Sequence, residues 1–211
     1  MMNVRKGFAV IAITAAAFGL AGCQATTGTK TSGQVALANE GVVFSAPAGY
    51  CLARSSRQSA QNSNFLLFGD CAALTKDPNR STAPHQSVLS ASLGPALDAP
   101  VESRFDVIEA FVRSDAGRSV MARSGKASDV TVLSRQVAGD VLLLKIRDTS
   151  ATKDQPVAQD YWRAVTGLNG RVATLSVLPK KTAPMSDREQ ARLLLEFAAR
   201  SKAATASGKK Q

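Results

Sequence analysis

The chain has 211 residues and a formal net charge of +10, a length that fits one domain with terminal extensions and a core of ordinary size. The sequence contains no P-loop, no dinucleotide-binding fingerprint and no Gly-x-Ser-x-Gly elbow, which excludes the enzyme classes that depend on these motifs. The excess of Lys and Arg suggests an anionic partner or only aids solubility, and no dense basic run marks a nucleic-acid patch.

Residues 1–22 have the organisation of an export signal. Arg5 and Lys6 precede an apolar segment, residues 8–20, and small residues follow it. A segment of this length is too short to cross a bilayer as a relaxed transmembrane helix. We therefore expect residues 1–22 to direct export.

The sequence Leu-Ala-Gly-Cys that ends at Cys23 resembles the lipobox of bacterial lipoproteins. The resemblance implies cleavage before Cys23 and addition of acyl chains such as palmitate, which would hold the protein firmly on a membrane. In this family an Asp after the cysteine favours retention at the inner membrane. Gln24 therefore implies the periplasmic face of the outer membrane. The alternative is a cysteine that merely ends a signal peptide or an apolar anchor.

Cleavage would leave 189 of the 211 residues and lower the net charge from +10 to +8, because Arg5 and Lys6 lie in the signal. A periplasmic protein meets little nucleic acid, so no nucleic-acid partner is expected. Besides the membrane that holds the lipid anchor, an anionic lipid or an acidic envelope polymer is the expected partner. The sequence identifies no protein partner.

Cys51 and Cys71 remain once Cys23 is assigned to the lipid. An even pair in an oxidising compartment predicts a disulfide, which would close a loop of about 20 residues and contribute about 3 kcal/mol. Two free buried thiols or a metal pair are the alternatives. A zinc site needs about four ligands, and His85 is the only histidine, so no metal site is expected.

The remaining chain divides into a tether, a domain and a tail. Residues 23–39 comprise the lipidated N-terminus and a flexible tether, residues 40–202 a single domain, and residues 203–211 a disordered basic tail. Short apolar or alternating runs predict strands at 41–47, 50–54, 65–68, 87–93, 130–137, 141–149, 159–168 and 171–178. Polar runs predict loops at 58–64, 76–84 and 151–156, and residues 114–125 a break with a short helical turn.

A middle helix is indicated by Phe105, Ile108 and Val112, which fall at i, i+3 and i+7. Ser103 and Asp106 have the spacing of a capping box at its start.

A last helix is predicted from Asp187 to about Lys202, with Ser186 and Glu189 as a capping box. Before it, Asn169-Gly170 gives the strongest hairpin signal in the chain.

Consecutive hairpins predict an α+β fold, a mostly antiparallel sheet covered by two amphipathic helices. The opening VVFSAPAGY, the middle helix, the hairpin YWRAVTGLNGRVATLSV and the closing helix are similar to PsbP-like domains over most of residues 41–202. The resemblance implies a sheet-and-helix module often used as an accessory or binding unit. It carries over no catalytic residue and no cofactor.

The catalytic candidates are weak. His85 stands alone beside a proline in a polar loop, which favours a solvated residue over a catalytic one. A series of acidic residues near the middle helix fits a solvent-facing side rather than a carboxylate pair: Asp98, Glu102, Asp106, Glu109 and Asp115. We therefore expect no catalytic residue and no enzymatic activity.

One aromatic-basic cluster is a candidate ligand patch. Strand alternation places Tyr161 and Arg163 on one face and Trp162 on the other. If Trp162 faces the helices, then Tyr161, Arg163 and Arg171 across the hairpin would form an exposed patch for an anionic or sugar-like ligand. An ordinary exposed strand face is the alternative.

Together these features predict a membrane-anchored periplasmic lipoprotein that acts as a non-enzymatic binding or accessory module of the cell envelope. The competing hypotheses are a hydrolase that acts on envelope material, with a site built from residues distant in sequence, and a structural envelope protein.

Overall fold

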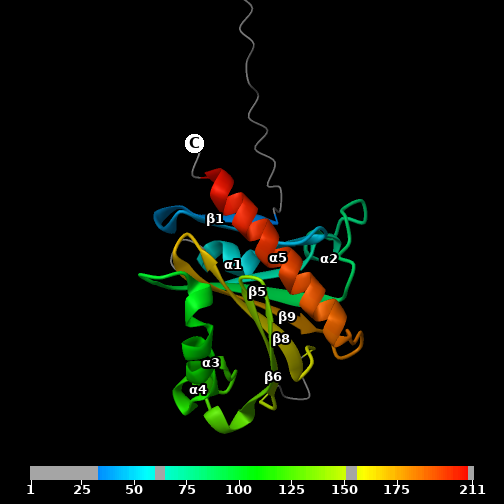
Figure 1. Ribbon diagram of the computed structural model, residues 1–211. Coiled ribbons are helices and arrows are strands. Elements are labelled where there is room, and N and C mark those ends of the chain that lie inside the picture. The colour runs from blue at the N-terminus through cyan, green and yellow to red at the C-terminus, as the bar shows by residue number, and fades with distance from the viewer. Residues whose placement is uncertain (1–32, 60–64, 151–155, 209–211) are drawn as a thin grey trace, which may run out of the picture. The chain divides into compact units, whose positions relative to one another are not determined.

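The computed structural model describes residues 33–59, 65–150 and 156–208 (Figure 1). The strands are β1 Gln34–Leu37, β2 Val42–Ser45, β3 Tyr50–Leu52, β4 Phe65–Asp70, β5 Ser87–Ala96, β6 Val130–Ala138, β7 Val141–Asp148, β8 Asp160–Leu168 and β9 Arg171–Pro179. The helices are α1 Arg54–Ser59, α2 Cys71–Thr75, α3 Phe105–Arg113, α4 Asp115–Met121 and α5 Asp187–Gly208, with short 3-10 helices η1 Ala38–Glu40, η2 Val101–Arg104 and η3 Ala127–Asp129. The predicted signal, Cys23, and most of the predicted loops at 58–64 and 151–156 lie outside the described residues.

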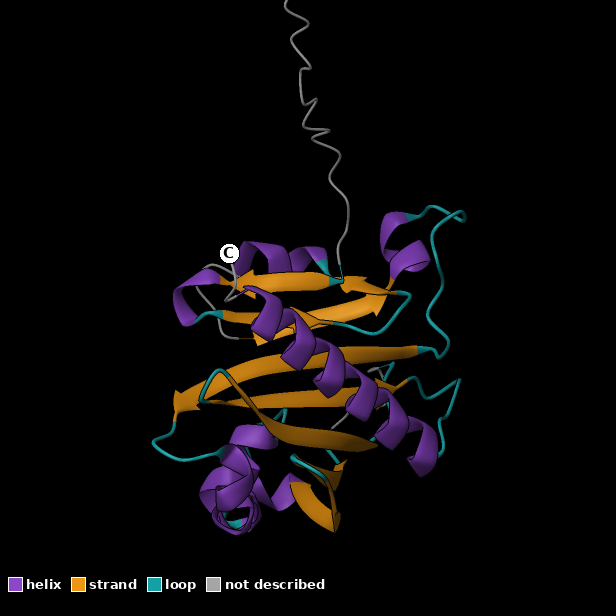
Figure 2. Cartoon of the chain, turned by 45° about the horizontal axis from the view of Figure 1, so that its top comes forward, coloured by secondary structure: helices purple, strands orange, loops and turns teal. Residues whose placement is uncertain are grey.

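Seven strands form one antiparallel sheet in the order β3-β4-β5-β9-β8-β7-β6, and β1 pairs with β2 in a separate antiparallel ribbon (Figure 2). Helix α5 packs on β7, β8 and β9 of this sheet, and α3 contacts β6. The predicted α+β class, with a mostly antiparallel sheet and helices packed on it, is confirmed.

A tight turn joins the two strands of each long hairpin. Asn169 and Gly170 connect β8 to β9 with φ values of 51° and 73°, the left-handed backbone that a two-residue hairpin turn requires. Gly139, with φ of 60°, lies in the turn from β6 to β7. The hairpin predicted at Asn169-Gly170 is therefore confirmed, and the strands predicted at 130–137 and 141–149 pair in a second hairpin.

The two faces of the sheet differ, and we name them after the helices that pack on them. The α5 face carries a large apolar core in which the Trp162 indole is 1% exposed and Phe68 meets Phe197 edge to face at 5.5 Å. Helix α5 runs obliquely across the strands on this side (Figures 1 and 2). The α3–α4 face has a smaller core, which includes Phe105, Val112 and Ile146.

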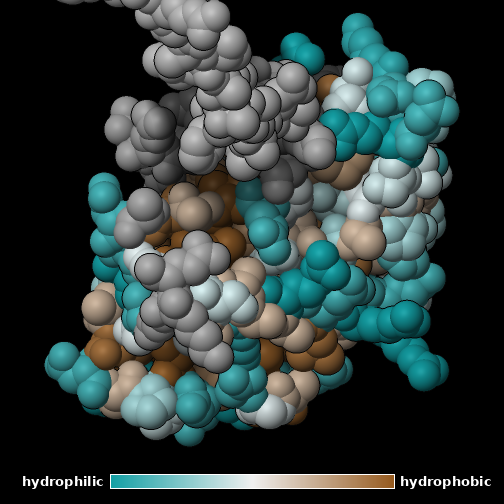
Figure 3. All heavy atoms as spheres, turned by 90° about the horizontal axis from the view of Figure 1, so that it is seen from above, coloured by the Kyte–Doolittle hydropathy of each residue, from teal (hydrophilic) through white to brown (hydrophobic). Residues whose placement is uncertain are grey.

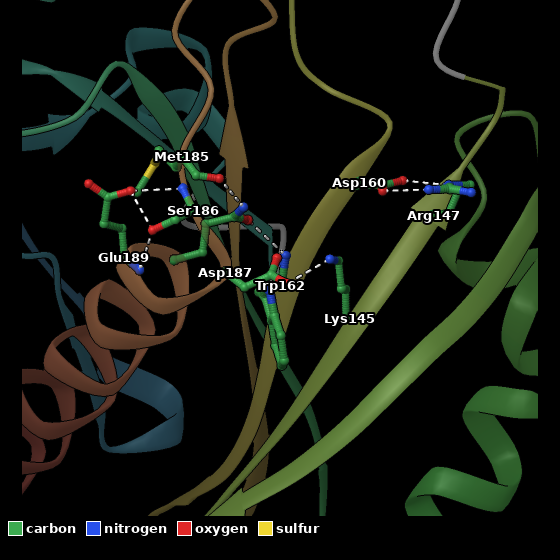
Figure 4. A network of polar contacts seen from close by, with 9 residues as sticks. Lys145, Arg147, Asp160, Trp162, Met185, Ser186, Asp187 and Glu189 are labelled. Atoms are coloured by element: carbon green, nitrogen blue, oxygen red, sulfur yellow. Dashed lines mark hydrogen bonds and ion pairs between the residues drawn. The ribbon is translucent and has the colours of Figure 1, made fainter.

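A polar network fixes the start of α5 to the sheet (Figure 4). The Trp162 indole Nε1 donates to Asp187 Oδ1 at 3.0 Å, and Lys145 Nζ donates to Asp187 Oδ2 at 2.7 Å. Ser186 and Glu189 form the predicted capping box, since the Ser186 hydroxyl accepts from the Glu189 amide while the Glu189 carboxylate accepts from the Ser186 amide. The predicted start of this helix is therefore confirmed.

Replacing Asp187 with asparagine is expected to reduce the free energy of unfolding by about 1 kcal/mol at pH 7. The hydrogen bonds from Lys145 and then from Trp162 hold the pKa of the Asp187 carboxyl below its usual range. A carboxyl with a lowered pKa in the folded state stabilises the protein at neutral pH, and this stabilisation is lost as the pH falls below about 4.

Urea unfolding across this pH range measures the effect, with Glu196→Gln, an exposed carboxyl on the same helix, as the matched control. The stability gap between wild type and Asp187→Asn should narrow as the solution is acidified. A gap that is constant with pH, or equal to that of the control, would contradict the assignment.

The predicted boundaries of the domain are wrong at both ends. Residues 34–37, assigned to the tether, form β1, because Leu37 is buried and Val35 pairs with Phe44 of β2. Residues 203–208, assigned to the tail, continue α5. The Thr205 hydroxyl, which is buried, accepts from the Val43 amide of β2 at 3.0 Å. The ribbon and the helix end therefore stabilise each other.

The predicted capping box at Ser103 and Asp106 is also wrong. The 3-10 helix η2 precedes α3, and the Ser103 hydroxyl donates to the Pro100 carbonyl at 2.7 Å. Asp106 instead forms an ion pair with Arg135 of β6 at 2.9 Å. A proline just before the segment favours this extra turn, because its fixed φ suits the residue that precedes a helix.

The disulfide between Cys51 and Cys71 is confirmed. It joins β3, at one edge of the sheet, to the first residue of α2, and both sulfur-bearing side chains are buried. The Cys71 amide also donates to the Gly49 carbonyl at 2.9 Å. The disulfide therefore adds a covalent link to an edge strand that is paired with β4 over three residues.

Strand β6 forms the other edge of the sheet and is irregular. A bulge between Val132 and Ser134 interrupts its register with β7. Arg113 of α3 donates to the Val132 carbonyl at 3.1 Å, and Arg135 forms an ion pair with Glu109 of α3 at 2.7 Å. Helix α3 is therefore tied to this edge.

Polarity is mixed over the surface seen from above, where hydrophilic residues gather on the right and hydrophobic ones show toward the centre and the left (Figure 3). Within the described part of the chain, no helix combines the length and the apolar character needed to cross a membrane.

Candidate functional site

A pocket of about 570 Å³ opens between the helices α3 and α4 and the sheet. Its sheet side comes from β5, β8 and β9, and its opposite side from the two helices, which lie beside these strands in Figure 1. Ligand pockets in proteins are typically of this size, lined by apolar side chains with a few polar groups. The pocket is therefore the candidate binding site.

The sheet side of the pocket contains two hydroxyl groups. On the α5 face, β5 and β9 present Leu and Val side chains to the core. On the opposite face, Ser92 of β5 is paired with Thr174 of β9, and both residues line the pocket. This contrast follows from strand alternation, since Ser90 and Ser92 of β5, and Thr174 and Ser176 of β9, stand two residues apart. The α5 face of the sheet is thus covered by the apolar core, whereas the opposite face presents polar groups to the pocket.

The helix side of the pocket is apolar and in part exposed. Val107 and Phe111 of α3 are 63% and 54% exposed, and Val120 of α4 is 80% exposed. All three line the pocket, and they are half of the six large hydrophobic residues exposed in the described ranges. Apolar side chains that converge on a cavity while remaining in water favour a ligand that would cover them.

The corner between α3 and α4 sets the shape of this wall. Ser114 ends α3 and begins α4, and its hydroxyl accepts from the Gly117 amide at 3.2 Å. Gly117 is buried, and a Cβ atom placed there would meet the Phe111 carbonyl oxygen at a distance that no real contact allows. The close approach of the two helices therefore requires glycine at this position.

Arg163 of β8 places a positive charge in the pocket. Its side chain is half-buried, and its Nε donates to the Ser176 hydroxyl at 3.2 Å. Its guanidinium also lies 5.7 Å from the centre of the Tyr161 ring. In the ranges that the structure describes, no carboxylate forms an ion pair with Arg163.

The predicted exposed patch is not formed. Tyr161 and Arg163 do share a face, as alternation predicted, but Tyr161 is 2% exposed, because it belongs to the core beneath α4. The guanidinium of Arg123, which follows α4, lies 5.9 Å from the centre of the Tyr161 ring. Its two terminal nitrogens are buried and have no hydrogen-bond partner among the described residues. Tyr161 is therefore enclosed and serves the core rather than a surface patch.

Arg171 lies elsewhere on the hairpin. It stands next to the β8–β9 turn, where its Nε donates to the Gly94 carbonyl at 3.0 Å and its Nη1 pairs with Glu40. It does not line the pocket. Of the three residues predicted for the patch, only Arg163 reaches the candidate site.

The groups suited to acid-base or metal chemistry lie apart. His85 does not line the pocket; its carbonyl accepts from the hydroxyl of Tyr50, whose pKa is raised by burial. Glu109 pairs with Arg113 and Arg135. Where side chains are described, no group of three or more His, Cys, Asp or Glu is placed to hold a metal ion.

Sequence reasoning missed most of the residues that line the pocket. The hydroxyl residues Ser92 and Thr174 look like ordinary strand positions. The one usable signal was the second apolar flank of the middle helix, Val107 and Phe111, which lies outside its core stripe.

Comparisons with known proteins add no relative. No protein-family model matches the chain, and no match is found among curated proteins. The function must therefore be argued from the site itself.

Proposed function

We propose that the protein is a lipid-anchored periplasmic lipoprotein that acts as a non-enzymatic binding module of the cell envelope. The observation that carries the binding function is the pocket between α3–α4 and the sheet, with its exposed apolar wall and the charge of Arg163. The Leu-Ala-Gly-Cys sequence at Cys23 supports the anchor, and Gln24 supports the outer membrane. The disulfide between Cys51 and Cys71 supports an oxidising compartment.

Binding is tested with the full chain carrying Cys23→Ser, which removes the acyl chains that would compete for the pocket. The neutral apolar fluorophore 1-N-phenylnaphthylamine should bind to one saturable site. Thr174→Phe should weaken its binding at least tenfold, because a benzyl group on the sheet side would fill the cavity. Thr131→Phe, the same change at an exposed position of β6, is the matched control. Equal affinity in both variants would contradict the assignment of the pocket.

The anchor predicts a second result. In the native host, Cys23→Ser should move the protein from the membrane pellet to the soluble periplasmic fraction, because acyl chains are the expected means of attachment. The intact mass of the wild-type protein extracted from membranes should show loss of residues 1–22 and the gain of acyl groups. If Cys23→Ser remains in the same pellet, or if the wild-type chain still carries residues 1–22, the proposed anchor is wrong.

A further inference from the structure

The charge of Arg163 is the feature of the pocket that most restricts its ligand. An arginine side chain carries its positive charge at any physiological pH. Taking an unpaired charge out of water is costly, and the cost falls when an opposite charge pairs with it. Arg163 is half-buried, its hydrogen bond to Ser176 uses only Nε, and no described carboxylate forms an ion pair with it. An anionic group on a ligand would supply the missing partner.

The rest of the pocket favours an aliphatic chain. Apart from the Ser92 and Thr174 hydroxyls and the charged Asp98, Arg104 and Arg163, most of its lining is apolar. The apolar side chains include Val107, Ile108, Phe111, Val120 and Met121 on the helix side, and Val165 and Val172 on the sheet side. Each of these offers methyl groups or a ring but no hydrogen bond. A sugar polymer would need several polar groups to replace its bonds to water, whereas an alkyl chain needs none.

Of the charged side chains that line the pocket, Arg163 is the one suited to hold an anionic group. Arg104 and Asp98 also line the pocket and are exposed, and their opposite charges offset each other. Arg163 lies on the sheet side beside Ser176 and is half-buried, so an ion pair there is screened less than one in open solvent. The anionic group therefore belongs at Arg163, with the chain running along the apolar wall.

We infer that the pocket binds a single-chain amphiphile with an anionic head group, its head paired with Arg163 and its alkyl chain covered by α3 and α4. This inference rests on the proposed function and deepens it. Of the two anionic partners considered for the basic charge, lipid and envelope polymer, it selects the lipid.

The test compares decanoate with decanol, which have the same chain and differ in charge. The affinity of each is measured by its displacement of 1-N-phenylnaphthylamine from the full chain carrying Cys23→Ser. Decanoate should bind about tenfold more tightly than decanol, because a partly buried ion pair contributes on this scale. Arg163→Gln should abolish this preference and leave decanol affinity within about twofold. Arg192→Gln, the same loss of charge on the exposed side of α5, is the matched control.

The outcomes separate the two proposals. Equal affinities for decanoate and decanol, or a preference that Arg163→Gln and Arg192→Gln reduce alike, would overturn the anionic head group while the fluorophore still marks the pocket. If Thr174→Phe weakens fluorophore binding, so that the fluorophore occupies the pocket, but neither decanoate nor decanol displaces it, the inference that the pocket binds an amphiphile is wrong. Loss of decanoate preference in Arg163→Gln alone, with unchanged thermal unfolding, supports the inference.

Discussion

Removing the disulfide by the double substitution Cys51→Ala and Cys71→Ala is expected to lower the free energy of unfolding by about 3 kcal/mol. The crosslink joins residues 20 apart in sequence. Closing a loop of this length lowers the conformational entropy of the unfolded chain, which stabilises the folded state by about 3 kcal/mol. In a domain of this size the midpoint of thermal unfolding should fall by roughly 6–12 °C. Strand β3 should open first, because it lies at an edge of the sheet and its register with β4 covers three residues.

Reduction provides the control for this experiment. Wild-type protein in excess dithiothreitol should unfold at the same urea concentration as the double variant, and the reductant should leave the variant unchanged. Hydrogen exchange at Cys51 and Leu52 should rise more than exchange in β8. If oxidised wild type and the double variant unfold together, the disulfide contributes no stability and this account of the edge is wrong.

Substituting alanine for Gly117 should destabilise the domain by about 2 kcal/mol, even though alanine is the better helix former. The added methyl group would collide with the backbone of Phe111 and Val112 rather than with a flexible side chain, so α3 and α4 would have to move apart. Since both helices line the pocket, affinity for 1-N-phenylnaphthylamine should change as well.

Gly208→Ala is the matched control, since a methyl group there would make only an ordinary contact with Val43 at the end of α5. Urea unfolding of the two variants should separate them by about 2 kcal/mol, with Gly208→Ala at or slightly above wild type. Equal stability of Gly117→Ala and wild type would mean that the corner between α3 and α4 is loose, and that the pocket has no fixed wall.

Much of the fold could be predicted because local residues decide it. Asn169 and Gly170 take the left-handed backbone that their turn needs, and Ser186 with Glu189 caps α5 as its spacing indicates. The disulfide followed from the count of cysteines and the expected compartment.

The errors arose where a distant contact decides the structure. Thr205 belongs to a run of small residues that resembles a disordered tail, and it is helical because its hydroxyl meets β2, 162 residues away. Residues 34–37 resemble the tether before them until β2 pairs with them. Neither partner can be found from the local sequence.

The site was the least predictable part. Alternation placed Tyr161 and Arg163 on one face correctly, but it does not show how far a helical pair extends over that face. Helices α3 and α4 bury Tyr161 and leave a cavity beside Arg163. That boundary depends on the corner at Ser114 and Gly117, which the sequence shows only as a break.

The irregular strand β6 has a consequence for how this molecule behaves at high concentration. An open edge of a sheet invites a second chain to add its own strand, the first step of lateral aggregation. Here the bulge at Val132 and Ser134 spoils the straight ladder, and the guanidinium of Arg113 already occupies the Val132 carbonyl. Neighbouring molecules should therefore not pair through β6 to form a continuous intermolecular sheet.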